Sequence, residues 1–215
     1  MPKIYLLRHA QSEANLQGIL AGPDNSVNLT KQGFQQSKIV AKHLKTIEFT
    51  KIFTSPINRC YQTVEPLLKF RPDIEFQTHN NLSEMDYGNW NGKKLDSLAK
   101  KAEWKIIQKT PSKFRFPKGE SFTQLRKRVQ NFLEEVVDEP GPILVVSHGD
   151  VIKMFLTCTL DQHTDNFQRF AISPSSLSII EYGTKNKSVS TTNQRISKDS
   201  IAMKFSKILL GGENA

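Results

Sequence analysis

The stretch "KIYLLRHAQSEAN", Lys3 to Asn15, decides the fold class of the chain. Its apolar run from Ile4 to Leu7 is short and continuous, which is typical of a strand buried on both faces of a sheet. The run stops at Arg8 and His9. Because a buried charge is costly unless it is paired, we expect these two basic side chains in a mouth at the end of the strand, outside the core.

A second stretch repeats this arrangement. "PILVVS", Pro142 to Ser147, predicts another buried strand, and His148 and Gly149 follow it directly. Three shorter strands are predicted at "KIFTS" (51–55), at "DIEFQ" (from 73) and at about 177–182. Helical patterns lie between most of these strands. Strands that alternate with helices predict an α/β layer sandwich with a mostly parallel central sheet.

The helix boundaries carry local signals. Thr30 can cap a helix that runs to about Leu44, and Ser55-Pro56 predicts a helix start with proline at its first position. Ser121 and Gln124 resemble a capping box before the clearest apolar stripe in the chain. The remaining predictions are a polar loop over 10–29, a helix near Leu95 to Gln108 and a helix over 150–160.

Composition limits the function classes. The 215 residues contain no apolar run near the ~20 that a membrane span needs, and Pro2-Lys3 leads into a strand without a signal-peptide pattern. We therefore expect a cytoplasmic protein that does not enter a membrane. Cys60 and Cys158 form neither a disulfide framework nor a zinc motif, so buried free thiols are expected. The net charge of +9 favours anionic partners, although the lysines are scattered.

The strand ends define a candidate site. In open α/β sheets, ligands bind beyond the carboxyl ends of the strands, and Arg8, His9 and His148 all fall there. Arg59 lies on the first turns of the helix that follows the second strand. If the strands are neighbours, two arginines and two histidines converge on one point and repel each other unless an anion lies between them. A phosphate dianion fits such a cluster, because guanidinium groups match its oxygens bidentately.

Five short motifs then resemble, in order and spacing, those of the histidine phosphatase superfamily, also called the phosphoglycerate mutase-like family. They span roughly residues 3–183. The motifs are Arg8-His9-Ala10; Ser55-Pro56 with Arg59 and Gln62-Thr63; Leu82-Ser83-Glu84 with Gly88 and Gly92; Pro117 to Ser121; and Ser147-His148-Gly149. The family usually has glycine where Ala10 stands, and the added methyl group does not argue against activity.

The resemblance implies a fold and a set of roles. It implies a single domain over 1–215 with a three-layer α/β/α sandwich and an insertion at about 83–118 above the site. His9 is expected to be the nucleophile and Glu84 the general acid. Arg8, Arg59 and His148 are expected to complete the phosphate pocket, and Asn15 matches a further phosphate-contacting position.

The chemistry of these residues agrees with the resemblance. Neighbouring arginines disfavour an imidazolium, so His9 should stay neutral near pH 7 and keep a lone pair for attack on phosphorus. Arg8, Arg59 and His148 would meet the charge on the equatorial oxygens, as a metal ion does in other enzymes. The expected function is therefore metal-independent hydrolysis of a small phosphorylated metabolite through a phosphohistidine, with no cofactor.

Several alternatives stay open. Asp86 rivals Glu84 as the acid, and Tyr87 and Trp90 either line the substrate side or only pack the loop. Neither cysteine has arginine six residues on, no P-loop is present, and no metal-binding motif occurs. Nothing resembles a nucleic-acid recognition element. A phosphoglycerate mutase and a non-catalytic phosphate-binding protein remain, but the insertion offers only Lys113 and Arg115 for a second anionic group, which favours a hydrolase.

The C-terminal extension, at about 184–215, is polar and basic and then turns apolar. It could add an edge strand and a short terminal helix. That helix could cover the sheet or mediate a homodimer.

Overall fold

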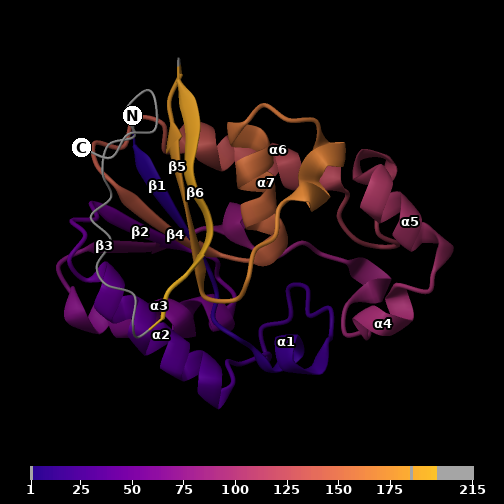
Figure 1. Cartoon of the computed structure of the whole chain (residues 1–215), viewed down its shortest axis with the longest axis horizontal. Helices are drawn as coiled ribbons and strands as arrows, with labels where there is room; N and C mark the ends of the chain where they lie inside the picture. The colour runs from indigo at the N-terminus through magenta and orange to yellow at the C-terminus, as the bar shows by residue number, and fades with distance from the viewer. Residues whose placement is uncertain (1, 185, 198–215) are drawn as a thin grey trace.

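The computed structural model describes residues 2–184 and 186–197. Within them a sheet of six strands forms the centre, in the order β3-β2-β4-β1-β5-β6 (Figure 1). The first four strands of that order are parallel, and β5 and β6 are antiparallel to their neighbours. The bounds are β1 (Lys3–Arg8), β2 (Lys51–Thr54), β3 (Glu75–Thr78), β4 (Ile143–Ser147), β5 (Ser176–Tyr182) and β6 (Lys187–Arg195).

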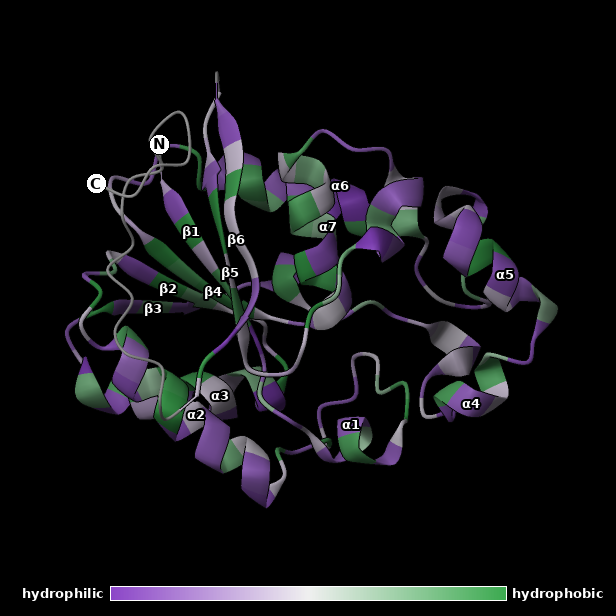
Figure 2. Cartoon of the chain, in the orientation of Figure 1, coloured by the Kyte–Doolittle hydropathy of each residue, from purple (hydrophilic) through white to green (hydrophobic). Residues whose placement is uncertain are grey.

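Helices cover both faces of the sheet. In β1 the side chains alternate: Ile4 and Leu6 enter one apolar cluster, and Tyr5 and Leu7 enter the other. The first cluster includes buried residues of α6 (Phe122–Glu135) and α7 (Gly149–Thr159), and the second includes those of α2 (Lys31–Leu44) and α3 (Asn58–Phe70). Figure 2 shows the mainly hydrophobic central strands between these helices. The predicted three-layer α/β/α sandwich is confirmed.

The register of two strands positions the site. Parallel pairing of β1 with β4 places Arg8 opposite Ser147. His9 and His148 are each one residue further along, and the His9 amide donates to the Ser147 carbonyl at 2.9 Å. Both histidines therefore lie just beyond the carboxyl ends of two neighbouring strands, as the sequence predicted.

Two of the predicted helix caps are also confirmed. The Thr30 hydroxyl accepts a hydrogen bond from the Gly33 amide, and α2 ends at Leu44. Ser121 and Gln124 form a complete capping box at the start of α6. At both helices the local sequence signal coincides with the observed helix start.

Three predictions of local structure were wrong. The 10–29 loop contains a short helix, α1 (Glu13–Gln17), which Ser12 and Asn15 start with a capping box. Pro56 does not begin α3, because Ile57 is extended (φ −78°, ψ 129°) and the first helical residue is Asn58. The third strand begins at Glu75 instead of Asp73.

The single helix predicted near Leu95 to Gln108 is two helices, α4 (Leu95–Leu98) and α5 (Ala102–Lys109). Leu98 and Ile107 are both buried. At 3.6 residues per turn these two positions would lie on opposite faces of one continuous helix. A break, with Lys101 extended, lets both side chains reach the core.

In the described part of the chain, the remaining elements are four short 3₁₀ helices: η1 (Asn80–Leu82), η2 (Gly88–Trp90), η3 (Pro111–Lys113) and η4 (Thr164–Arg169). Strand β6 is the expected edge strand of the C-terminal extension, whereas the expected terminal helix lies outside the described residues. The single-domain boundary 1–215 stays a prediction. Over residues 2–184 and 186–197, no helix is long and apolar enough to cross a membrane.

Candidate active site

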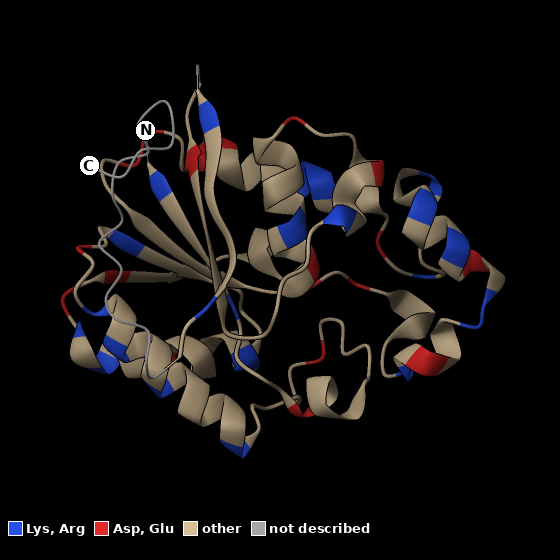
Figure 3. Cartoon of the chain, in the orientation of Figure 1, with Lys and Arg blue, Asp and Glu red and all other residues tan. Residues whose placement is uncertain are grey.

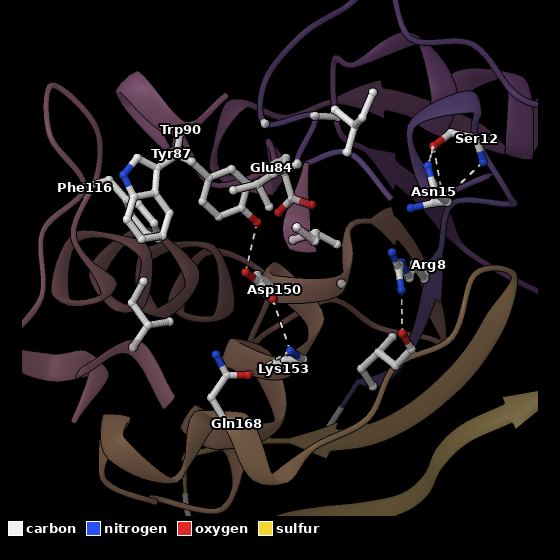
Figure 4. Close-up of a pocket in the computed structure, with 18 of the residues that line it drawn as sticks. Arg8, Ser12, Asn15, Glu84, Tyr87, Trp90, Phe116, Asp150, Lys153 and Gln168 are labelled. Carbon is white, nitrogen blue, oxygen red and sulfur yellow. Dashed lines mark hydrogen bonds and ion pairs between the residues drawn. The ribbon is translucent and has the colours of Figure 1, made fainter. Parts of the chain in front are cut away.

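A cavity of about 530 Å³ opens beyond the carboxyl ends of β1 and β4. Arg8 and His9 reach it from the end of β1, Arg59 from the first turn of α3, and Glu84 from the loop after η1. Figure 4 shows Arg8 and Asn15 on one side of this cavity and Tyr87, Trp90 and Phe116 on the other. The cavity therefore has a basic end and an aromatic end.

His9 is held in one tautomer. Its Nδ1 lies 2.7 Å from the carbonyl oxygen of Ala10, and since a carbonyl only accepts, Nδ1 carries the proton. Nε2 is then left with its lone pair. Burial is the main cause that holds the pKa of His9 well below its ordinary value, and the charges of Arg8 and Arg59 act in the same direction. The predicted neutral imidazole is thus supported, but burial contributes more than the arginines.

One guanidinium nitrogen of Arg8 donates a hydrogen bond to the protein, and another has no hydrogen-bond partner among the described residues. Its Nη1 donates to the Ile172 carbonyl at 2.6 Å, while the buried Nε has no hydrogen-bond partner among the described residues. Gly149 makes room for this side chain, since a Cβ at that position would lie 3.3 Å from the Arg8 Cζ. An unpaired buried donor is costly, so Arg8 is well suited to an anion.

Arg59 ties the 10–29 loop to the site. It is 1% exposed, and it donates from Nη1 to the Asp24 carbonyl (3.0 Å) and from Nη2 to the Gly22 carbonyl (2.8 Å). Its Nη2 also lies 3.2 Å from Nδ1 of His148. Because neither carbonyl carries a formal charge, the guanidinium keeps its net positive charge at the basic end of the cavity.

His148 lies between Arg59, Ser55 and Glu84. Arg59 can only donate, so Nδ1 of His148 accepts, and Nε2 donates to the Ser55 hydroxyl at 2.8 Å. Burial and then Arg59 hold the pKa of His148 well below its ordinary value. The rings of His9 and His148 have centroids 5.2 Å apart. His9 lines the cavity, whereas His148 is fully buried behind the lining residues.

Glu84, and not its rival Asp86, lines the cavity. The Asp86 carboxylate accepts from the Gly88 amide (2.9 Å) and from the Asn91 amide group (2.8 Å), so it stabilises its own turn. Burial and the nearby Asp150 charge raise the pKa of Glu84 to about 7, against the opposing effect of Arg59. Glu84 can therefore exchange a proton near neutral pH.

Asn15 lines the same cavity, although its carbonyl oxygen already has partners. Oδ1 accepts from the amide and from the hydroxyl of Ser12, each at 3.1 Å. Figure 4 shows this side chain on the Arg8 side of the cavity. The amide nitrogen is the part that can donate to an anion, and its contact with phosphate stays a prediction.

Sequence reasoning missed an anionic group in this site. Asp150 accepts from the Tyr87 hydroxyl at 2.9 Å, and Lys153 lies 3.3 Å from its other oxygen. Lys153 also donates to Gln168 at 3.1 Å. The sequence did indicate an acidic residue near the site, since Asp150 directly follows His148-Gly149 at the end of a strand. Tyr87 and Trp90 are buried and both line the cavity, which supports the first of the two readings left open for them, a place on the substrate side.

Cys60 lies beneath the basic end, with its sulfur 3.4 Å from Nε2 of His148. Burial raises the pKa of this thiol to about 12. A thiol with such a pKa stays protonated at neutral pH and is a weak nucleophile. Both cysteines are buried and free, as the sequence predicted.

The raised pKa of Glu84 has a measurable consequence for stability. Its ordinary value is 4.5 and the value in the folded protein is about 7, so the folded state binds more protons between these values and stability falls as pH rises through this range. We expect Glu84→Gln to raise the free energy of unfolding by about 2–3 kcal/mol at about pH 8 and by less than about 1 kcal/mol at about pH 5. Urea unfolding at both pH values measures this, and a pH-independent difference would contradict it.

Comparison with known proteins now adds to this geometry. The family described as "Histidine phosphatase superfamily (branch 1)" matches residues 4–195. The chain therefore belongs to the histidine phosphatase superfamily and is an enzyme of its phosphatase class. The resemblance stated from five motifs is confirmed.

Individual relatives agree with this membership. "Phosphoserine phosphatase 1" of Hydrogenobacter thermophilus is 29% identical over 187 residues, which cover 84% of this chain and 86% of that protein. "Probable phosphoglycerate mutase GpmB" of Photorhabdus laumondii is 32% identical over 187 residues, 85% of this chain and 86% of that one. Bacillus stearothermophilus YhfR has a solved structure with a TM-score of 0.82 at 24% identity, covering 90% of this chain and 98% of that one, which shows the fold.

Proposed function

We propose that this phosphatase hydrolyses a small phosphomonoester through a phosphohistidine on His9, without a metal ion. One observation carries the proposal: two neutral, buried imidazoles have ring centroids 5.2 Å apart, beside the guanidinium groups of Arg8 and Arg59. This cluster matches the charge and shape of a phosphoryl group.

In the first step, Nε2 of His9 attacks phosphorus and the bond to the leaving oxygen breaks. Glu84, with a pKa of about 7, gives its proton to that oxygen, so an alcohol leaves instead of an alkoxide. Arg8 and Arg59 stabilise the negative charge on the equatorial oxygens. Asn15 and His148 are proposed to donate further hydrogen bonds to these oxygens. His148 can do so if its Nδ1 takes the proton, the Ser55 hydroxyl donates to Nε2, and Arg59 Nη2 donates to the anion instead of to Nδ1.

In the second step, the ionised Glu84 takes a proton from water. The water oxygen attacks phosphorus, the nitrogen–phosphorus bond breaks, and inorganic phosphate leaves with His9 neutral again. The reaction is thereby divided into two steps with lower barriers. Glu84 ends protonated and ready for the next substrate.

Metal independence and a cytosolic location are part of the proposal. Over residues 2–184 and 186–197, no group of three or more His, Cys, Asp or Glu side chains could hold a metal ion. Buried free thiols at both cysteines suit a reducing compartment. An assay with and without chelator tests the first claim, and loss of activity in chelator would refute it.

Hydrolysis is tested by measuring phosphate release from a panel of phosphoserine, phosphoglycerates, sugar phosphates and nucleoside phosphates. We expect catalytic release of phosphate from at least one ester. The same preparation, given 3-phosphoglycerate with 2,3-bisphosphoglycerate, is expected to form little 2-phosphoglycerate. Efficient isomerisation without phosphate release would identify a mutase and overturn the hydrolase assignment.

Asp150 provides a test of the proton donor. Since Glu84 must be protonated to act as acid, kcat/KM for an alkyl phosphate should fall as pH rises above about 7. Asp150→Asn removes a negative charge that favours the protonated form of Glu84. The fall in kcat/KM should therefore occur at a pH lower by roughly one unit than in the parent enzyme. Asp96→Asn is the matched control, because Asp96 is an exposed residue of α4 that does not line the cavity. Its kcat/KM should fall at the same pH as that of the parent enzyme. If kcat/KM of Asp150→Asn falls at the same pH as in the parent enzyme, the assignment of Glu84 as the proton donor is contradicted.

A further inference from the structure

The leaving-group end of the cavity has an apolar lining. Six Phe, Tyr and Trp residues line the cavity, and we call five of them the aromatic wall: Tyr87, Trp90, Trp104, Phe116 and Phe170. Phe116 packs edge-on against Tyr87 (centroids 5.1 Å apart) and against Trp90 (5.4 Å). Three of the five are buried by this mutual packing, so the wall is preorganised. Such a surface contacts a ligand through apolar area more than through hydrogen bonds.

The same end lacks an unpaired positive charge. Among the cavity-lining residues that the structure describes, the lysine and arginine side chains are Arg8, Arg59 and Lys153, and the arginines lie at the basic end. Lys153 already pairs with Asp150 at 3.3 Å and donates to Gln168 at 3.1 Å. Figure 4 shows this Lys153–Asp150 pair next to the Tyr87 hydroxyl.

The 83–118 insertion, which the structure describes in full, adds no cation. Lys113 and Arg115, which the sequence offered for a second anionic group, do not line the cavity, and neither does any other lysine or arginine of this segment. A carboxylate on the leaving group would instead approach the carboxyl groups of Asp150 and Glu84. Such an approach is unfavourable because Asp150, the ion-pair partner of Lys153, carries a charge of the same sign.

From these observations we infer that the preferred substrates are phosphomonoesters of alcohols that carry an apolar or aromatic group and no second anionic group. This inference rests on the proposed function and narrows its substrate class. The aromatic wall binds the organic group, while the negative charge of Asp150 disfavours phosphoserine-like and phosphoglycerate-like leaving groups. Figure 3 shows acidic and basic residues interspersed along the chain.

The test compares three primary alkyl phosphates: 2-phenylethyl phosphate, O-phosphoserine and 3-phosphoglycerate. All three lose a primary alcohol, which keeps the leaving-group chemistry similar. We expect kcat/KM of the parent enzyme for 2-phenylethyl phosphate to exceed that for the other two by roughly tenfold or more. This comparison requires no variant and therefore does not depend on any substitution folding.

Two variants on α5 then locate the effect. Trp104→Ala is expected to lower kcat/KM for 2-phenylethyl phosphate roughly tenfold and to leave phosphoserine turnover nearly unchanged. Ile106→Ala is the matched control, because Ile106 is exposed on the same helix and does not line the cavity. We expect Ile106→Ala to leave kcat/KM for both substrates unchanged. Equal losses on both substrates in Trp104→Ala would assign the residue to folding alone and overturn its role in selectivity.

Lys153→Met distinguishes this inference from the alternative that Lys153 binds a carboxylate of the substrate. If Lys153 bound a substrate carboxylate, the variant would lose phosphoserine and 3-phosphoglycerate turnover roughly tenfold more than 2-phenylethyl phosphate turnover; we expect no such difference. Equal or better turnover of the two anionic esters by the parent enzyme would overturn the inference and leave the proposed function standing. Failure to hydrolyse any of the esters in the panel or in this comparison would overturn the proposed function itself.

Discussion

His9→Ala is expected to lower kcat/KM by at least roughly 10⁴-fold, the order of loss seen when the nucleophile of a covalent hydrolytic mechanism is removed. Alanine has no lone pair that can attack phosphorus, and His9 is the only histidine among the described residues that line the cavity. The measurement is phosphate release from the best ester of the panel, compared between the variant and the parent enzyme.

His43→Ala is the matched control for this variant. His43 lies on α2, does not line the cavity, and should be replaceable without loss of turnover. Binding of vanadate to His9→Ala, followed by calorimetry, checks that the pocket is still folded. Full turnover in a folded His9→Ala protein would rule out His9 as the nucleophile.

Glu84→Gln is expected to have the second-largest effect, and the size should depend on the leaving group. A general acid contributes roughly 10²–10⁴-fold when the departing oxygen needs a proton. For an alkyl phosphate, kcat/KM should therefore fall by that factor. For 4-nitrophenyl phosphate it should change little, because nitrophenolate leaves without a proton and kcat/KM reports the steps up to its release.

Asp86→Asn tests the rival acid in the same assay. Asp86 stabilises its turn through Gly88 and Asn91, so any change in this variant should be equal for the two esters. A leaving-group dependence in Asp86→Asn, together with its absence in Glu84→Gln, would reverse the assignment of the two carboxylates.

The sequence predicted the basic end of the site well, for a physical reason. A short apolar run flanked by polar residues favours a buried strand, and a basic residue directly after it is expected at the end of that strand, so Arg8, His9 and His148 were located by their strands. Placing them side by side required the strand order, which the resemblance supplied and the β1–β4 register confirmed.

The aromatic end could not be predicted to the same depth. Tyr87 and Trp90 lie at the short η2 and Trp104 on the short α5. The positions of such short elements depend on tertiary packing, and no periodic pattern indicates which ring faces a cavity. The break between α4 and α5 is of the same kind, since it follows from burying both Leu98 and Ile107. The choice of Glu84 over Asp86 likewise depended on hydrogen bonds that only the folded chain reveals.

The central claim is a covalent bond between His9 and phosphorus, and rapid quenching tests it most directly. The enzyme would be mixed with a ³²P-labelled ester, quenched in alkali within milliseconds and digested, and the labelled peptide would be sequenced. We predict an alkali-stable, acid-labile label on the peptide that contains His9. Turnover at full rate with no label on that peptide, or with the label on another side chain, would contradict the mechanism.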